Sequence, residues 1–242
     1  MAENKKNQTP CVAFDADVLR MLSAMHACLK KYPNYDFNKF KDDFIKRNHQ
    51  DLLMLLNLIK TDQLHVFIGN TVFQQVKHRL EVCEFIKLYC YFPKLNVLTF
   101  NELLEKADDL ASQYCSHYLF KGEEKYPPMD LNYSPISRKQ APSDDAYIMA
   151  EASIAGCMFI TNNGKHFIFR GNRKGDKNSR ALGIITINKA NHYCEELDNG
   201  ETITPKPVLV RQFCEWIKTQ GLDQIMMPDV DVNNFELGSN VL

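Results

Sequence analysis

The chain has 242 residues, of which 45% are hydrophobic and 24% are charged, so it is long enough to bury the core of one large domain. Its 29 Lys and Arg residues balance 30 Asp and Glu residues, which excludes a uniformly basic nucleic-acid-binding surface. The eight cysteines include no C-x-x-C pair, and this spacing argues against a zinc site.

The amino-terminal ten residues are polar and lack the apolar core of a secretory signal. No later stretch approaches the roughly 18 uninterrupted apolar residues of a membrane span. We therefore expect a cytoplasmic protein with free thiols and no membrane partner. The predicted organisation is a polar leader at 1–10, a single domain at 11–220 with insertions near 30–62 and 121–142, and a C-terminal tail at 221–242.

Apolar runs alternate with amphipathic segments along the domain, and this alternation predicts an α/β fold with a mainly parallel central sheet. We expect Asn70 or Thr71 to cap the third helix and Ser143 to cap the last one. The expected elements, in chain order, are a strand within 11–19 that ends where the charges begin, a helix at 18–31 closed by Pro33, a helical region at 37–63, a strand at 64–70, a helix at 71–92, a strand at 95–100, a helix at 101–120, an irregular loop at 121–142, a helix at 143–156, and strands at 157–163 and 182–188.

Acidic and amide side chains recur where the predicted strands end or the helices begin. Ligands of parallel α/β sheets gather at the carboxyl ends of the strands, so these side chains are expected at one edge. Oxygen ligands without neighbouring His or Cys favour Mg²⁺ or Mn²⁺. Each residue taken alone also fits an ordinary helix cap or turn. The side chains concerned are Asp15 and Asp17 after the first strand, Asp144 and Asp145 at a helix start, and Asn162 and Asn163 after "FIT".

Three segments together resemble the PIN-domain ribonuclease family, in matching order from about Val12 to Ile187. They read "VAFDADVLRML", "HVFIGNTVFQQVKH" and "SDDAYIMAEASIAGCMFITNNGKHF". The resemblance implies a three-layer α/β/α sandwich with a mainly parallel central sheet. It also implies an acidic pocket that binds one or two divalent ions, with single-stranded RNA as the usual substrate.

Carried over position by position, the resemblance implies that Asp15, Asp145 and Asn163 are catalytic. The implied metal ligands add supporting positions to these three. One departure concerns the family's glutamate in the helix after the second strand, where this chain has Gln75, or Gln74 if the register slips. Losing one negative charge is expected to weaken metal binding without ending it, because Mg²⁺ commonly binds through one or two carboxylates and keeps several waters. The full predicted metal set is Asp15, Asp17, Gln75, Asp144, Asp145 and Asn163.

A basic segment follows the predicted Asn163 corner and contains only one acidic residue, Asp176. It is predicted to bind the phosphates of RNA beside the metal, although a solvated Gly-rich loop would have the same composition. The predicted activity is metal-assisted hydrolysis of RNA by an endoribonuclease. The predicted RNA-binding residues are Lys165, Arg170, Arg173, Lys174, Lys177 and Arg180.

Two other interpretations fit parts of the sequence. The missing glutamate is compatible with a PIN-like domain that only binds RNA or a protein partner. The Asp-x-Asp-Val stretch also resembles the first motif of haloacid-dehalogenase-type phosphatases, but their Gly-containing turn is lacking. Many PIN-domain proteins are toxins that form homodimers and are neutralised by an antitoxin, so the resemblance implies such partners. The length of this chain departs from that toxin pattern.

Overall fold

The computed structural model describes residues 9–93, 105–107, 144–162, 195–196, 202–203, 208–222 and 235–240. These residues form an α/β fold around a six-stranded sheet with the order β7-β4-β1-β2-β3-β8. All neighbouring pairs are parallel except β3 with β8, which is antiparallel. A separate antiparallel pair joins β5 and β6. The strands are β1 Cys11–Phe14, β2 His65–Phe67, β3 Cys90–Pro93, β4 Met158–Thr161, β5 Glu195–Glu196, β6 Thr202–Ile203, β7 Val208–Leu209 and β8 Phe235–Leu237.

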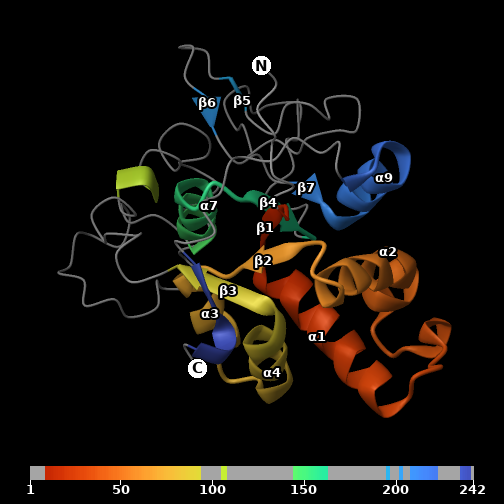
Figure 1. The fold of residues 1–242 in the computed structure, drawn as a ribbon. Coiled ribbons are helices and arrows are strands. Elements are labelled where there is room, and N and C mark those ends of the chain that lie inside the picture. Colours follow the sequence, from red (N-terminus) through yellow and green to blue (C-terminus); the bar gives the residue numbers. More distant parts are fainter. Residues whose placement is uncertain are drawn as a thin grey trace, which may run out of the picture.

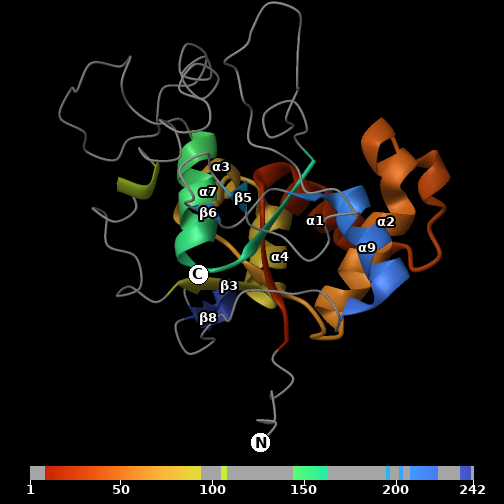
Figure 2. The same ribbon diagram turned by 90° about the horizontal axis from the view of Figure 1, so that it is seen from above.

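Helices lie on both sides of this sheet. Figures 1 and 2 show α7 on one side, with α1, α2 and α9 on the other. Helix α1 packs against α2 and α4, while α3 contacts both α1 and α7. The helices are α1 Ala16–Lys31, α2 Asp43–Lys60, α3 Asn70–Val76, α4 Leu80–Tyr89, α7 Asp144–Ile154 and α9 Val210–Gln220, with 3-10 turns η1 Phe37–Lys39 and η5 Gly238–Asn240.

Strand β1 lies in the middle of the sheet, and all four of its residues are buried. Val12 pairs with Val66 of β2 on one side and with Met158 of β4 on the other. A parallel strand covered on both faces needs a continuous apolar run rather than an alternating one, and "CVAF" supplies it. The first predicted strand is thus confirmed, and it ends at Asp15.

Helix α1 forms as predicted because its start, buried face and end all have local causes. Asp15 caps its first turn, and Val18, Leu19 and Leu22 bury an apolar stripe. The helix ends before Tyr32, which precedes Pro33. A residue before proline is disfavoured in the helical region, so this end is set by the sequence.

The single helix expected over 71–92 is wrong. The chain forms α3 and then α4, separated by a turn at residues 77–79, and Cys90–Pro93 is strand β3. The backbone at Cys90 is extended, and Cys90 and Tyr91 pair with Val66 and Phe67 of β2. Ladder hydrogen bonds to β2 therefore replace the helical ones. The strand expected at 95–100 lies outside the described residues.

Two further boundaries differ from the prediction. Helix α3 starts one residue earlier than expected, with Gly69 as its N-cap instead of Asn70 or Thr71. In the region 37–63, Phe37 lies in the 3-10 turn η1, and the α-helix begins only after Asp42, whose side chain accepts hydrogen bonds from two backbone N–H groups of the first turn.

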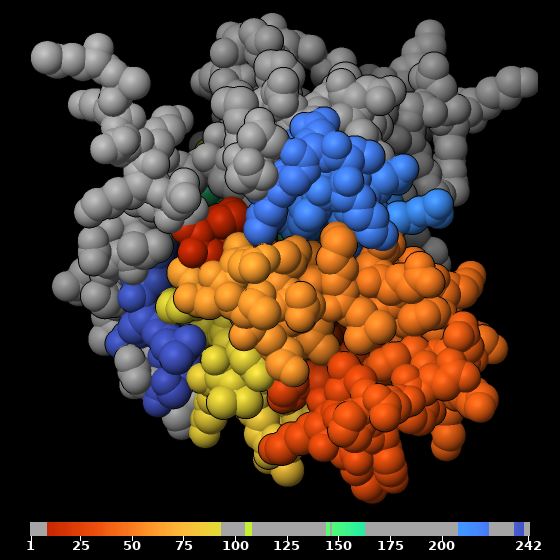
Figure 3. Space-filling view, turned by 45° about the vertical axis from the view of Figure 1, so that its right-hand side comes forward, coloured from red at the N-terminus to blue at the C-terminus, as the bar shows by residue number. Residues whose placement is uncertain are grey.

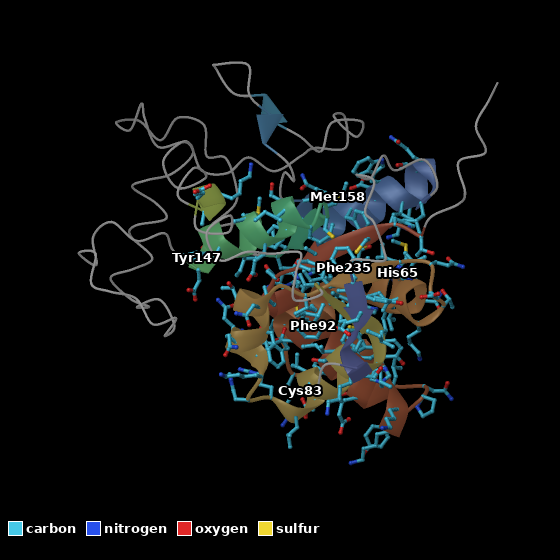
Figure 4. The ribbon with its side chains drawn as sticks, turned by 60° about the vertical axis from the view of Figure 1, so that its left-hand side comes forward. His65, Cys83, Phe92, Tyr147, Met158 and Phe235 are labelled. Carbon is cyan, nitrogen blue, oxygen red and sulfur yellow. The ribbon has the colours of Figure 1, made fainter. Side chains whose placement is uncertain are left out.

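Residues 235–237, which fall in the predicted tail, form the edge strand β8. The Phe235 ring meets Phe67 edge to face at 5.5 Å between centroids. Phe92 of β3 and Phe235 of β8 mark this pair of strands in Figure 4. None of the helices in the described part of the chain has the length and apolar character of a membrane span.

Candidate active site at the carboxyl ends of the strands

Asp15 lies at the carboxyl end of the central strand β1 and is only 6% exposed. Its Oδ1 accepts a hydrogen bond of 2.8 Å from the Val18 backbone N–H, which caps α1. Its own backbone N–H donates to the Ile160 carbonyl of β4 at 3.2 Å. The carboxylate is thus fixed at the point where strand becomes helix.

The second oxygen of Asp15 joins β1 to the end of β4. Oδ2 accepts hydrogen bonds from the Thr161 hydroxyl and, at 3.3 Å, from the Asn162 backbone N–H. The partners in these two contacts are far apart in the sequence, with separations of 146 and 147 positions. The end of β4 thus meets Asp15 through the Thr161 hydroxyl and the Asn162 backbone N–H, whereas the side-chain amide of Asn162 contacts the Met21 sulfur at 3.7 Å.

The surroundings of Asp15 perturb its ionisation. Burial raises the pKa of this carboxyl from 3.8 to about 6, against the lowering effect of the hydrogen bonds from Thr161, Val18 and Asn162. Burial disfavours the charged form, and the three donors favour it. A cation placed beside Asp15 would favour the charged form further.

Asp17 lies in a different environment from Asp15, although only one residue separates them. Its side chain is 54% exposed and binds Arg20 at 2.7 Å on the outer surface of α1. An ion pair three residues apart on a helix is an ordinary surface feature. The structure thus gives Asp17 a cationic partner on α1 itself.

A second polar contact joins α3 to α7. The Nε2 of Gln75 donates to the Oδ2 of Asp144 at 3.0 Å. Burial raises the pKa of the Asp144 carboxyl; the Gln75 hydrogen bond lowers it, and the neighbouring Asp145 charge raises it. Of the two candidates at the start of α7, Asp144 is therefore the one that contacts Gln75.

Sequence reasoning missed Glu151, the most deeply buried carboxylate near this site. Glu151 is 1% exposed and lies on α7. Its Oε1 accepts hydrogen bonds from the backbone N–H and the hydroxyl of Thr71, at 3.0 and 3.1 Å. Burial raises its pKa from 4.5 to about 7. The only signal in the sequence is one acidic residue in the apolar run "AYIMAEASIAG".

Gly69 explains how Glu151 reaches the start of α3. A Cβ atom on Gly69 would lie 2.0 Å from the Oε2 of Glu151 and 3.0 Å from its Cβ. The φ angle of Gly69 is −74°, which any residue can adopt. Glycine is therefore required here by the close approach of Glu151 and not by backbone conformation.

These contacts share one edge of the sheet. Asp15 and Thr161 close the carboxyl ends of β1 and β4, and α3 begins directly after β2. Helix α7 ends just before β4 starts, so Asp144 lies at the far end of α7, toward the same edge. Within the residues described, no three His, Cys, Asp or Glu side chains form a group that could hold a metal ion.

Several predicted site residues lie outside the described part of the chain. They include Asn163 and the whole basic segment, and the predicted loop at 121–142 also lies outside the described residues. The residues of that segment are Lys165, Arg170, Arg173, Lys174, Lys177 and Arg180.

Comparisons with protein-family models, with curated proteins and with solved structures found no match to this chain.

Proposed function

We propose that the protein is a divalent-metal-dependent endoribonuclease with a three-layer PIN-like domain. The observation that supports this most is the pair of long-range contacts at one edge of the sheet: Asp15 with Thr161, and Gln75 with Asp144. The second contact joins two members of the predicted metal set, and the first joins another member, Asp15, to the end of the strand that precedes Asn163. The mostly parallel sheet with helices on both sides supports the same fold.

The donor set suits Mg²⁺ or Mn²⁺ in chemical type. Asp15, Asp144 and Asp145 supply carboxylate oxygens, and the carbonyl oxygen of Gln75 is a further hard donor. Asn163 would supply a further oxygen ligand, as the PIN resemblance implies. When bound, the ion would supply a water of lowered pKa and neutralise charge that develops on the phosphate.

The residues of the chain have separate tasks in this proposal. Thr161 and the Asn162 N–H orient the Asp15 carboxylate by hydrogen bonds and favour its charged form. The Gln75 amide holds Asp144 through its nitrogen. The basic segment from Lys165 to Arg180 would bind the RNA phosphates.

A second candidate function is a PIN-like protein that binds RNA or a protein partner without cleaving RNA. The contact of Gln75 favours this second candidate. The Gln75 amide donates a hydrogen bond to Asp144, whereas a metal-binding glutamate at position 75 would repel Asp144. A phosphatase that uses Asp15 as a nucleophile is disfavoured, since α1 begins directly after Asp15, where such phosphatases have a Gly-containing turn.

Asp15→Asn tests the ribonuclease directly. Cleavage of a labelled single-stranded RNA in Mn²⁺ should be lost, because the ligand loses its charge while its size is kept. Asp62→Asn is the matched control, since Asp62 is exposed and its positive φ of 58° is a conformation that asparagine tolerates. Equal cleavage by the Asp15 and Asp62 variants would reject the assignment.

Gln75→Glu separates the two candidates. In a ribonuclease the added charge should tighten Mn²⁺ binding and lower the metal concentration needed for cleavage, since a unit charge about 4 Å from another contributes about 4 kcal/mol at an effective dielectric of 20, before desolvation. In a binding protein it should only repel Asp144 and lower the melting temperature. Titration with Mn²⁺ by calorimetry and by RNA cleavage tells which occurs.

A further inference from the structure

A polar groove of about 650 Å³ lies between α2 and α9, away from the residues of the candidate active site. The two helices pack side by side, with α9 in blue against α2 in orange in Figure 3. All ten residues that line the groove are polar or charged. Its charged members are Lys46, Arg47, Asp51, Arg211, Glu215 and Lys218.

Cations outnumber anions in this lining, four to two. Lys218 binds Asp51 at 2.6 Å, so this pair neutralises itself. Arg47 donates its Nε–H to the Asp43 carbonyl at 3.1 Å, which fixes the guanidinium and leaves its terminal amino groups for a ligand. Lys46 and Arg211 form no ion pair with any residue that the structure describes. The excess positive charge is thus available at one end of the groove.

That end faces the same edge of the sheet as Asp15. Helix α9 begins directly after β7, which runs parallel to β4 and β1, so Arg211 lies at the carboxyl ends of the strands. Helix α2 ends shortly before β2 begins, so its first turns, with Lys46 and Arg47, lie at that same edge. The start of α9 has no acidic residue in its first turn, so the positive end of its dipole adds to the charge there, whereas Asp42 and Asp43 offset the dipole at the start of α2.

The lining distinguishes between kinds of ligand. The centre of a protein interface is enriched in aromatic and apolar side chains and depleted of charged ones. This groove has the opposite composition, with guanidinium, ammonium and amide donors that suit phosphate oxygens. We propose that the groove between α2 and α9 binds the phosphodiester backbone of a single-stranded nucleic acid. Only the identity of that strand as RNA rests on the proposed function.

The test measures binding of a fluorescent oligouridine to the full chain by anisotropy, in EDTA so that metal-dependent cleavage cannot occur. Lys46→Glu with Arg211→Glu removes two phosphate contacts. The matched control, with the same change in net charge, is Arg79→Glu with Lys87→Glu, at the N-cap and in the last turn of α4. Two lost contacts should reduce the slope of log K against log salt by about 1.4 and weaken binding about 25-fold at 0.1 M salt. The control should change affinity by less than about threefold.

Equal weakening in the groove variant and the control would overturn the proposal, as would unchanged binding in the groove variant. Competition by polyglutamate as effective as that by oligouridine at equal charge would also overturn it, in favour of an acidic protein partner. If the charge reversal prevents folding, Lys46→Gln with Arg211→Gln should give a smaller loss in the same direction, and no loss would count against the groove. If the groove variant binds more weakly but the parent does not cleave RNA in Mn²⁺, the groove proposal is upheld and the ribonuclease is rejected. If the parent cleaves RNA but binding does not depend on the groove, the ribonuclease is upheld and the groove proposal is rejected.

Discussion

Glu151 offers the sharpest test of how burial and hydrogen bonding oppose each other beside the candidate site. The perturbation is Glu151→Gln, which keeps the shape of the side chain and removes its charge. The carboxylate is 1% exposed and accepts hydrogen bonds from the N–H and hydroxyl of Thr71. Burial outweighs these donors, because the pKa of the carboxyl is raised from 4.5 to about 7.

The sign of the pH effect follows from this raised pKa. Between pH 4.5 and 7 the folded protein holds a proton on Glu151 that the unfolded chain releases, so the free energy of unfolding falls as the pH rises through this window. A pKa raised from 4.5 to about 7 corresponds to about 3 kcal/mol of unfolding free energy. The glutamine side chain of the variant does not titrate, so relative to the parent the variant gains about 3 kcal/mol between pH 4.5 and pH 8.

Urea unfolding at several pH values measures this difference, with the fluorescence of the single tryptophan, Trp216, which is buried in the core. Glu81→Gln is the control, because that side chain is exposed on α4. If both variants show the same change of unfolding free energy with pH, the cause is the loss of a negative charge and not the burial of Glu151. A constant difference between parent and Glu151→Gln from pH 4.5 to pH 8 would refute the reasoning.

Two more predictions concern the contacts around Glu151 and Asp15. Gly69→Ala should lower the free energy of unfolding by about 1–3 kcal/mol, because the added Cβ would meet Glu151. The loss should be much smaller in a Glu151→Ala background. Equal losses in both backgrounds, measured by urea unfolding, would contradict the close approach of Gly69 and Glu151. Thr161→Val removes a hydroxyl that donates to Asp15, so the pKa of Asp15 should rise above its value of about 6. Carbon NMR of the Asp15 carboxyl follows this titration, and an unchanged midpoint would show that the hydroxyl contributes nothing to the charged form.

The parts of the fold that could be predicted from the sequence have local causes. The junction of β1 and α1 is specified within a few residues, by an apolar run that suits a central parallel strand and by an aspartate that caps the following helix. The strand β3 had no such local signal. Phe85, Ile86 and Tyr89 continue at helical spacing toward Cys90, and only pairing with β2 decides that the helix ends there. Tertiary pairing of this kind overrides local propensity.

The candidate site shows the same division. Asp15 could be found because its position after a strand is visible in the sequence. Which of Asp144 and Asp145 contacts Gln75 could not be predicted, because the two partners are 69 positions apart in the sequence. Glu151 is the one acidic residue of an apolar run, and its partner Thr71 is 80 positions away in the sequence. Long-range hydrogen bonds therefore carried the information that local patterns lacked.

The two contacts between α3 and α7 give Gln75 a structural role. Thr71 binds Glu151 and Gln75 binds Asp144, so the earlier residue of α3 meets the later residue of α7, and in both cases α3 donates to a carboxylate of α7. A glutamate at position 75 would place two carboxylates in contact at a partly buried site, where only a cation would offset their repulsion. The amide replaces that repulsion with a hydrogen bond and makes the junction of the two helices independent of metal. In the proposed ribonuclease, Gln75→Glu should therefore raise metal affinity and lower metal-free stability, because the added carboxylate attracts a cation and repels Asp144.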